Sequence, residues 1–201
     1  MKAINGWDKL QGYTGGEAQE RLPAGGYVGK IIGAKVATYN GAGGTFEKLE
    51  IALDVTEGDF KGFYKKQFEA STLESKKWKG VLRLNIPTED GSDADTFRQR
   101  ILKGAIDAIE DSNSGYHWGW DETTLKDKKV GFLVRDKQYD FNGKQGFFSE
   151  IFALISVEAA REHKYKDPAP KLLNNGSGSG SSAGGQDAAT FSKSENEDYP
   201  F

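Results

Sequence analysis

A β-strand is most clearly encoded in Thr45-Phe-Glu-Lys-Leu-Glu-Ile-Ala-Leu-Asp-Val-Thr-Glu57, where apolar and polar side chains alternate. A repeat of two residues places alternate side chains on opposite faces of a strand, so one face can be buried while the other meets solvent. The side chains expected to face inward are Leu49, Ile51, Leu53 and Val55. Those expected to face outward are Phe46, Lys48, Glu50 and Asp54.

The segments on either side predict two neighbouring strands. Residues 27–39 alternate in the same way, and Gly29 and Gly33 within them indicate β-bulges or a coiled strand. The glycine-rich run at 40–44 predicts a hairpin turn rather than a phosphate-binding loop, because such loops lead into a helix and here a strand follows. Residues 60–68 are dense in aromatic and lysine side chains and predict the third strand. The members of that strand expected to share one face are Phe60, Tyr64, Lys66 and Phe68.

A helix is predicted after the third strand. Ser92 is a suitable N-cap, and two aspartates follow it in the first turn, where the helix dipole favours acids. Apolar side chains recur at helical spacing from Phe97, and the helix is expected to end near Asp111. Residues 158–165, close to the end of the body, predict one further helical turn.

Two more strands are predicted at residues 129–139 and 147–157, joined by Asn142-Gly143, the strongest short signal for a hairpin. The fold class predicted from these elements is mainly β, a five-stranded barrel with a helix inserted between strands 3 and 4. These are the elements of an oligonucleotide-binding (OB) fold, and the same set fits other small barrels.

Four segments are expected along the chain of 201 residues. Residues 1–26 form an irregular arm packed on the body, and residues 27–171 form the OB-fold domain. Residues 172–193 form a Gly/Ser linker that is too poor in apolar side chains to offset the entropy of ordering. Residues 194–201 form an acidic tip, so the C-terminal region as a whole is expected to be a disordered tail.

Charge and composition restrict the class of protein. The chain has 27 Lys and Arg against 30 Asp and Glu, and the residues before Leu172 carry 26 of each sign. Because nucleic-acid binders are commonly basic, binding would require local clustering of Lys and Arg. The absence of cysteine excludes disulfides and cysteine-ligated metals. The N-terminus has no run typical of a signal peptide and the longest apolar run, 151–157, is too short to span a bilayer, so we expect a cytoplasmic protein without membrane contact.

The acidic tip is expected to bind a partner protein. It ends in Pro and a C-terminal Phe, so the carboxylates can meet a basic rim while the terminal ring and α-carboxylate enter a pocket. Proline restricts its neighbour and reduces the entropy lost on docking. The residues predicted to bind the partner are Glu195, Glu197, Asp198, Tyr199, Pro200 and Phe201.

The tip also resembles a known family. Asp198-Tyr-Pro-Phe201 after a Gly/Ser tether is similar to the end of bacterial single-stranded DNA-binding proteins (SSBs), which finish in Asp, an apolar residue, Pro and Phe. This chain places Tyr199 at the apolar position and has fewer acids than many members. The body, with its long insertion, is more similar to the OB-fold SSBs of bacteriophages. The resemblance implies a protein of a bacterial host cell that coats single-stranded DNA during phage replication, recombination and repair, and recruits partner proteins of those processes through its tail.

Binding single strands without sequence preference requires cations for phosphates and exposed rings for stacking, which contributes roughly 1–3 kcal/mol per base. Aromatic residues are interleaved with Lys and Arg in three segments: 60–68, 76–83 and 135–141. Burial in the core is the alternative for each ring. The predicted single-stranded DNA-binding residues are Tyr39, Phe46, Lys48, Tyr64, Lys66, Phe68, Trp78, Arg83, Lys137, Tyr139 and Phe141.

The sequence favours a protein that is not an enzyme. His117 and His163 are far apart and lack metal-ligand spacing with carboxylates, and no serine stands in a nucleophile-elbow pattern. No catalytic residue, metal or cofactor is therefore expected. A β-barrel adaptor that acts only through protein contacts is the alternative, and a carbohydrate-binding β-domain is a third. Homo-oligomerisation, site size and the choice between DNA and RNA are left open.

Overall fold

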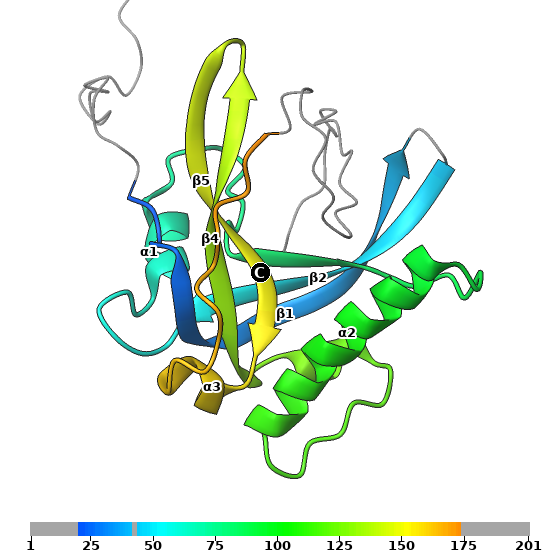
Figure 1. The fold of residues 1–201 in the computed structure, drawn as a ribbon. Helices are drawn as coiled ribbons and strands as arrows, with labels where there is room; N and C mark the ends of the chain where they lie inside the picture. The colour runs from blue at the N-terminus through cyan, green and yellow to red at the C-terminus, as the bar shows by residue number, and fades with distance from the viewer. Residues whose placement is uncertain (1–19, 42–43, 174–201) are drawn as a thin grey trace, which may run out of the picture.

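The computed structural model describes residues 20–41 and 44–173, which form a mixed α/β fold around one antiparallel sheet (Figure 1). The sheet has five strands in the order β3-β2-β1-β4-β5. The strands are β1 (Gly25–Gly41), β2 (Gly44–Val55), β3 (Val81–Asn85), β4 (Lys129–Phe141) and β5 (Lys144–Ile155). The helices are α1 (Phe63–Ala70), α2 (Asp93–Ser112), the 3-10 turn η2 (Glu122–Leu125) and α3 (Val157–Arg161). The predicted linker and acidic tip lie outside the described residues except for 172–173, as do residues 1–19 of the predicted arm.

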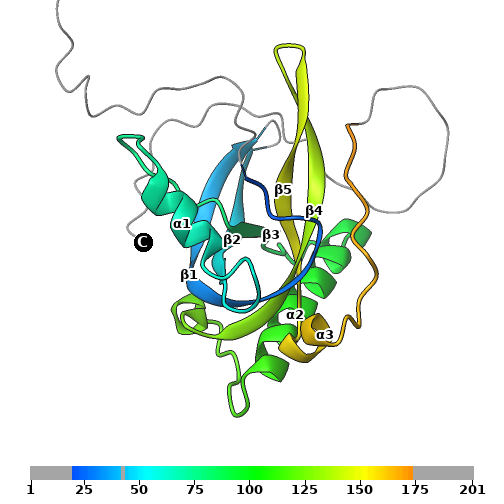
Figure 2. The same ribbon diagram turned by 90° about the vertical axis from the view of Figure 1, so that its left-hand side faces the viewer.

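The core lies on one face of the sheet, where α2 packs against it, and Phe63 and Tyr64 of α1 also belong to it. Leu49, Ile51, Leu53 and Val55 of β2 are all buried, so the inward-facing set predicted from the alternation is confirmed. Helix α2 follows β3 and packs against β3, β4 and β5 (Figure 2). Its side chains in the core are Leu102, Ala105, Ile106, Ala108 and Ile109. The predicted helix between the third and fourth strands is confirmed.

Local signals define the ends of α2 and of the last hairpin. The Ser92 hydroxyl accepts a hydrogen bond from the Asp95 backbone N–H at 3.1 Å, so the predicted N-cap is confirmed. Asn142 and Gly143 adopt φ of 51° and 76°, the left-handed pair that a two-residue hairpin turn requires. Strands β4 and β5 therefore pair down to Phe141 and Lys144.

A β-bulge in β1 changes which side chains face outward. The pairing of β1 with β2 shifts between Ile31 and Gly33, which confirms a bulge at a predicted glycine. Gly29 has a different role, since a Cβ there would lie 2.5 Å from both the Asp54 carbonyl oxygen and the Phe132 ring. Strands β1 and β4 can therefore approach closely at the base of the sheet, while the outer half of β1 twists away with β2.

The third strand was predicted at the wrong place. Residues 60–68 form a turn and α1, whereas the third strand is Val81–Asn85. Gly62 has φ of 71° and starts the helix, and the Asp54 carboxylate accepts the backbone N–H of Tyr64 at 3.0 Å in its first turn. Phe63 and Tyr64 are both buried, which two consecutive residues of a half-exposed strand cannot be. The density of aromatic side chains here reflects a helix packed on the core and not a strand.

The predicted closed barrel is also not found. Strands β3 and β5 are the two edges of the sheet, and they approach each other without forming a ladder of hydrogen bonds. Strand β3 has only five residues, and α2 packs against both edges and covers the core there. The described part of the chain is thus a mixed α/β fold with an open, strongly curved sheet (Figure 2). Within this part, no helix has the length and apolar character needed to cross a membrane.

Candidate nucleic-acid interface

Two long hairpins extend from the body as separate arms (Figure 1). We define the β1–β2 arm as residues 35–41 and 44–50, and the β4–β5 arm as residues 135–150. The face of β1, β2 and β3 that points away from the core is called the outer face. Strand register assigns the side chains of this face, because directly paired residues lie on the same side of a sheet.

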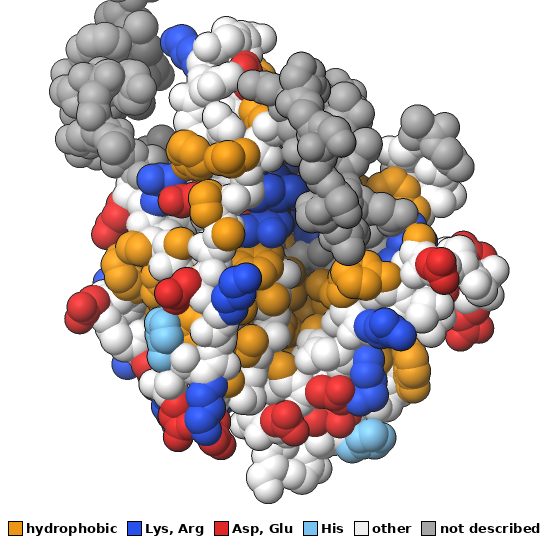
Figure 3. Space-filling view, in the orientation of Figure 1, with side chains coloured by type: hydrophobic (Ala, Val, Ile, Leu, Met, Phe, Trp, Pro, Cys, Tyr) orange, Lys and Arg blue, Asp and Glu red, His pale blue; other side chains and the backbone are white. Residues whose placement is uncertain are grey.

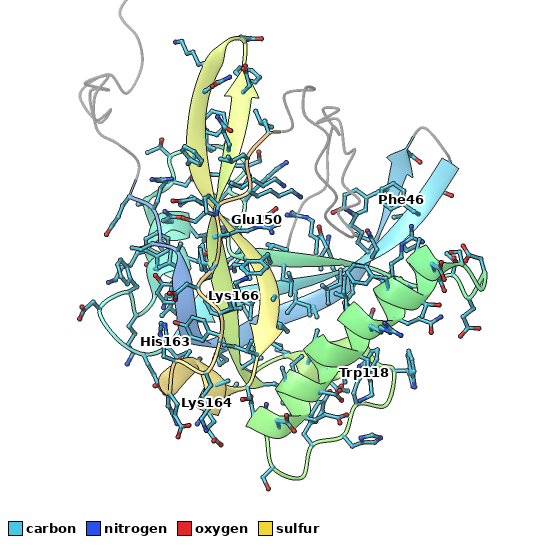
Figure 4. All side chains as sticks on the ribbon, viewed as in Figure 1. Phe46, Trp118, Glu150, His163, Lys164 and Lys166 are labelled. Carbon is cyan, nitrogen blue, oxygen red and sulfur yellow. The ribbon has the colours of Figure 1, made fainter. Side chains whose placement is uncertain are left out.

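The β1–β2 arm carries a pair of stacked rings with a lysine beside them. Tyr39 and Phe46 are directly paired across the strands, and their ring centroids lie 5.7 Å apart with planes inclined by 15°. The Lys48 ammonium lies 5.4 Å from the centroid of each ring, within the range of a cation–π contact. Phe46 is 40% exposed and lies on the side of its arm that faces the β4–β5 arm (Figure 4).

A buried carboxylate holds this group in place. Glu50 is 3% exposed and accepts hydrogen bonds from the Tyr39 hydroxyl and from Arg83 Nε, the latter at 2.7 Å. Burial is the main cause that raises the pKa of Tyr39, and the hydrogen bond to Glu50 adds to it, so this phenol stays protonated. Glu50 and Asp54 do lie on the outer face as predicted, but both are buried, since neighbouring groups cover them.

The β4–β5 arm has the same kind of carboxylate at its base. Glu150 accepts from Arg135 Nη2 at 2.6 Å and from Lys137 Nζ at 2.7 Å. All three side chains lie on one face of the arm, because Arg135 pairs with Glu150 and Lys137 pairs with Phe148. Glu150 therefore holds the two cations side by side, and the three side chains together carry a net charge of +1.

Rings continue along this arm toward its tip. The Lys137 ammonium lies 5.7 Å from the Phe148 centroid, and the Tyr139 ring lies 6.3 Å from the same ring. Tyr139 and Phe148 are each 42% exposed, and Phe141 near the turn is 71% exposed. Lys and Arg side chains gather at the base of this arm beside apolar side chains (Figure 3). Each arm therefore has exposed rings beside cations, and a carboxylate orients Arg83 next to one arm and Arg135 and Lys137 on the other.

The structure brings together seven of the eleven predicted binding residues in these two groups. Tyr39, Phe46, Lys48 and Arg83 lie on or beside the β1–β2 arm, and Lys137, Tyr139 and Phe141 lie on the β4–β5 arm. Tyr64 is 3% exposed, and it has no exposed ring face on which a base can stack. Its predicted position on a strand beside the groove was wrong because the chain is helical there.

Lys66, Phe68 and Trp78 lie elsewhere on the molecule, on α1 and the segment that follows it. The Phe68 and Trp78 rings contact each other, with centroids 5.7 Å apart. The Trp78 indole N–H donates to the Leu53 carbonyl oxygen at 3.0 Å, which fixes the segment on β2. These residues do not line the space between the arms.

Sequence reasoning missed Arg135, Phe148 and the two orienting glutamates. The signal for Phe148 was present, because counting back from the Asn142-Gly143 turn pairs Phe141 with Lys144 and therefore Lys137 with Phe148. The role of Glu50 had no such signal, since its partner Arg83 comes from a strand that was not predicted as such. The predicted partner-binding residues, Glu195 to Phe201, lie outside the described residues.

Comparisons with known proteins add no constraint: no protein-family model matches this sequence, and a search of curated proteins finds no relative. Among residues 20–41 and 44–173, no three His, Asp or Glu side chains are grouped so that they could hold a metal ion.

Proposed function

We propose that this protein binds single-stranded DNA without sequence preference, between and along its two hairpin arms. The observation that carries the proposal is that partly or fully exposed rings lie beside a cation on both arms: Tyr39, Phe46 and Lys48 on one, Lys137 and Phe148 on the other. Rings stack on any unpaired base, and cations along the same surface neutralise the phosphates. Duplex DNA keeps its bases stacked and offers no such ring contacts.

The arrangement of the fold supports the same proposal. An OB-fold is a five-stranded, partly open barrel that binds oligonucleotides on the face of its second and third strands and on the hairpin loops 1–2 and 4–5. Here the β1–β2 and β4–β5 hairpins are the two arms, β3 carries Arg83 between them, and α2 follows β3. We therefore propose an open version of the OB-fold.

The tip at residues 194–201 supports a second part of the proposal from sequence alone. We propose that it recruits replication, recombination or repair proteins of a phage or its bacterial host, while the body coats the strand. This part is independent of the arms, because removing the tip leaves every residue of the proposed DNA surface unchanged.

A titration of the full-length protein with fluorescently labelled oligo-dT tests the DNA proposal. We expect binding at about 50 mM salt that weakens as salt rises, because each phosphate contact releases counterions. Oligo-dA should bind with comparable affinity, and a duplex of the same length should bind much more weakly. No binding to either single strand at low salt would overturn the proposal.

One observation favours the alternative, an adaptor that acts through protein contacts. Trp120 is 79% exposed, and its ring lies 4.7 Å from that of Trp118 with the planes inclined by 38°. Trp118 lies beside α2 and away from the arms (Figure 4). The surrounding segment is acidic, with Asp111, Asp121 and Glu122, and so repels a phosphate backbone. If Trp120→Ala abolishes capture of a partner while the full-length protein ignores oligo-dT, the adaptor function is the correct one.

A further inference from the structure

A second cationic surface lies on α1 and the segment that joins it to β3. Residues 61–79 contain six lysines and two glutamates, a local charge of +4 in a body whose total charge is zero. The lysines are Lys61, Lys65, Lys66, Lys76, Lys77 and Lys79, and all six are exposed. We call the part formed by Lys76, Lys77 and Lys79 the lysine segment. This is the local clustering that a neutral body needs if it is to hold nucleic acid.

The lysine segment is held on a fixed scaffold. The indole N–H of Trp78 donates to the Leu53 carbonyl oxygen at 3.0 Å, and the Leu53 N–H donates to the Gly80 carbonyl oxygen at 2.8 Å. The Lys76 ammonium donates to the carbonyl oxygen of Glu69 at 3.2 Å and lies 5.9 Å from the Phe68 ring centroid. Hydrogen bonds thus join the segment to β2 on one side and to α1 on the other, so its lysines have a fixed place on the surface.

This surface continues the outer face that begins on the β1–β2 arm. Along β2 the positions on the outer face run from Phe46 through Glu50 to Asp54. Helix α1 covers Asp54, whose carboxylate accepts the backbone N–H of Tyr64. At about 3.3 Å per residue, the path from Phe46 to Asp54 is roughly 26 Å long. Strand β3 runs beside it, with Arg83 next to Glu50, and begins directly after Lys79 and Gly80. Cations therefore lie at the start, the middle and the end of one face.

We propose that a single strand bound at the arms continues along this face, and that the lysine segment binds its phosphates. This inference rests on the proposed function and extends it from the arms to the base of β2. The Phe68 and Trp78 rings are half-buried against each other, so the contact at this end is with the backbone rather than with bases. The length of single strand that one protein molecule covers then depends on the distance from the arms to α1.

The test compares short and long oligo-dT on the wild type and on K76Q/K77Q/K79Q, all in the full-length chain. The short oligonucleotide is the shortest that the wild type binds with measurable affinity, and the long one is several times that length. We expect the triple variant to bind the short strand as the wild type does. For the long strand, the slope of log K against log salt should fall by about 2, since each lost contact contributes roughly 0.7 for single strands.

A matched control removes the same charge elsewhere. K126Q/K129Q/K166Q changes three exposed lysines that lie outside the arms and outside the lysine segment. It should leave the salt slope for the long strand within about 0.3 of the wild type, because only contacted phosphates release counterions. All six positions are exposed, so thermal unfolding of both variants should match the wild type.

Each outcome separates this inference from the proposed function. If the wild type binds both lengths and the two triple variants behave alike, the continuation is wrong and the arms remain the site. An equal loss at both lengths also contradicts a continuation. If the wild type binds neither length, the proposed function itself fails. If poly-glutamate binds the wild type but not K76Q/K77Q/K79Q while the DNA slope is unchanged, the surface binds an acidic protein instead.

Discussion

Glu50 is the residue on which the proposed DNA surface of the β1–β2 arm depends. Its carboxylate is buried and accepts hydrogen bonds from Tyr39 and Arg83, which come from two different strands. A carboxylate on a surface meant for phosphates is unfavourable by itself, because like charges repel. Glu50 is nevertheless compatible with such a surface, because it is buried beneath the Tyr39 ring and the Arg83 guanidinium. It fixes these two groups in position, and Arg83 neutralises its charge.

Replacing Glu50 by Gln should lower stability. The amide oxygen can take the position of Oε1 and keep both hydrogen bonds, but the charge that pairs with Arg83 is lost, and hydrogen bonds to a neutral acceptor are weaker than those to a carboxylate. We expect the free energy of unfolding to fall by about 1–2 kcal/mol, less than for a fully buried pair because Arg83 is partly exposed. Urea unfolding measures this change. Glu47→Gln, at an exposed position of the same strand, is the control and should cost under about 0.5 kcal/mol. Equal effects of the two substitutions would contradict the role of Glu50.

Tyr64 offers the opposite test, because its hydroxyl group is buried without a hydrogen-bond partner within the described structure. Burial is also the main cause that raises its pKa, so the group stays neutral at any physiological pH. An unsatisfied buried hydroxyl costs free energy, so Tyr64→Phe should leave stability unchanged or raise it by about 1 kcal/mol. Oligo-dT affinity should not change. A loss of affinity in this variant would show that Tyr64 does contact DNA.

At the scale of elements, the junction between β3 and α2 depends on Asp95. Its fully buried carboxylate accepts the backbone N–H groups of Thr88 and Glu89 at 2.7 Å and 3.0 Å, and the Gln99 amide at 3.0 Å. The Thr88 N–H is the main cause that holds the pKa of Asp95 below its ordinary value of 3.8, against the effect of burial. This carboxylate ties the loop before α2 to the first turn of the helix.

The stability that Asp95 provides should depend on pH. Because its pKa is lower in the folded state, the contribution is complete above the ordinary value of 3.8 and is lost as the pH falls below it. Asp95→Asn should therefore unfold at lower urea concentration than the wild type at neutral pH, with a smaller difference near pH 3. Asp93→Asn, exposed in the same turn, serves as control. A difference that stays constant with pH would show that the effect is steric.

Elements with local signals were predictable from the sequence, and elements fixed by distant contacts were not. Ser92 and Asn142-Gly143 each satisfy backbone groups within a few residues, so their positions follow from the sequence alone. The start of α1 depends on Asp54, ten residues earlier and on another element. The arms were predicted as hairpins with exposed rings, but the cations fixed by Glu50 and Glu150 required the register of strands that pair over long distances.

At the scale of the whole molecule, the proposed function makes the two arms separate binding surfaces for one single strand. The Phe46 ring contacts Tyr39 and Lys48, whereas the Phe148 ring contacts Tyr139 and Lys137. Glu50 and Glu150 pair with different cations. Groups that share no partner contribute additively to binding free energy. The proposed function therefore predicts how substitutions on the two arms combine.

Phe46→Ala and Phe148→Ala should each weaken oligo-dT binding by about 5- to 150-fold, the equivalent of one stacked base at roughly 1–3 kcal/mol. The double variant should lose the sum of the two free energies to within about 0.5 kcal/mol when the strand is long enough to reach both arms. With an oligonucleotide too short to reach both, the strand can use the intact arm, and each single variant should lose much less. Trp120→Ala, which removes a larger and more exposed ring away from the arms, should change neither affinity. If one arm accounts for the whole loss at every length, the ligand does not bridge the arms, and the surface between them is not the binding site.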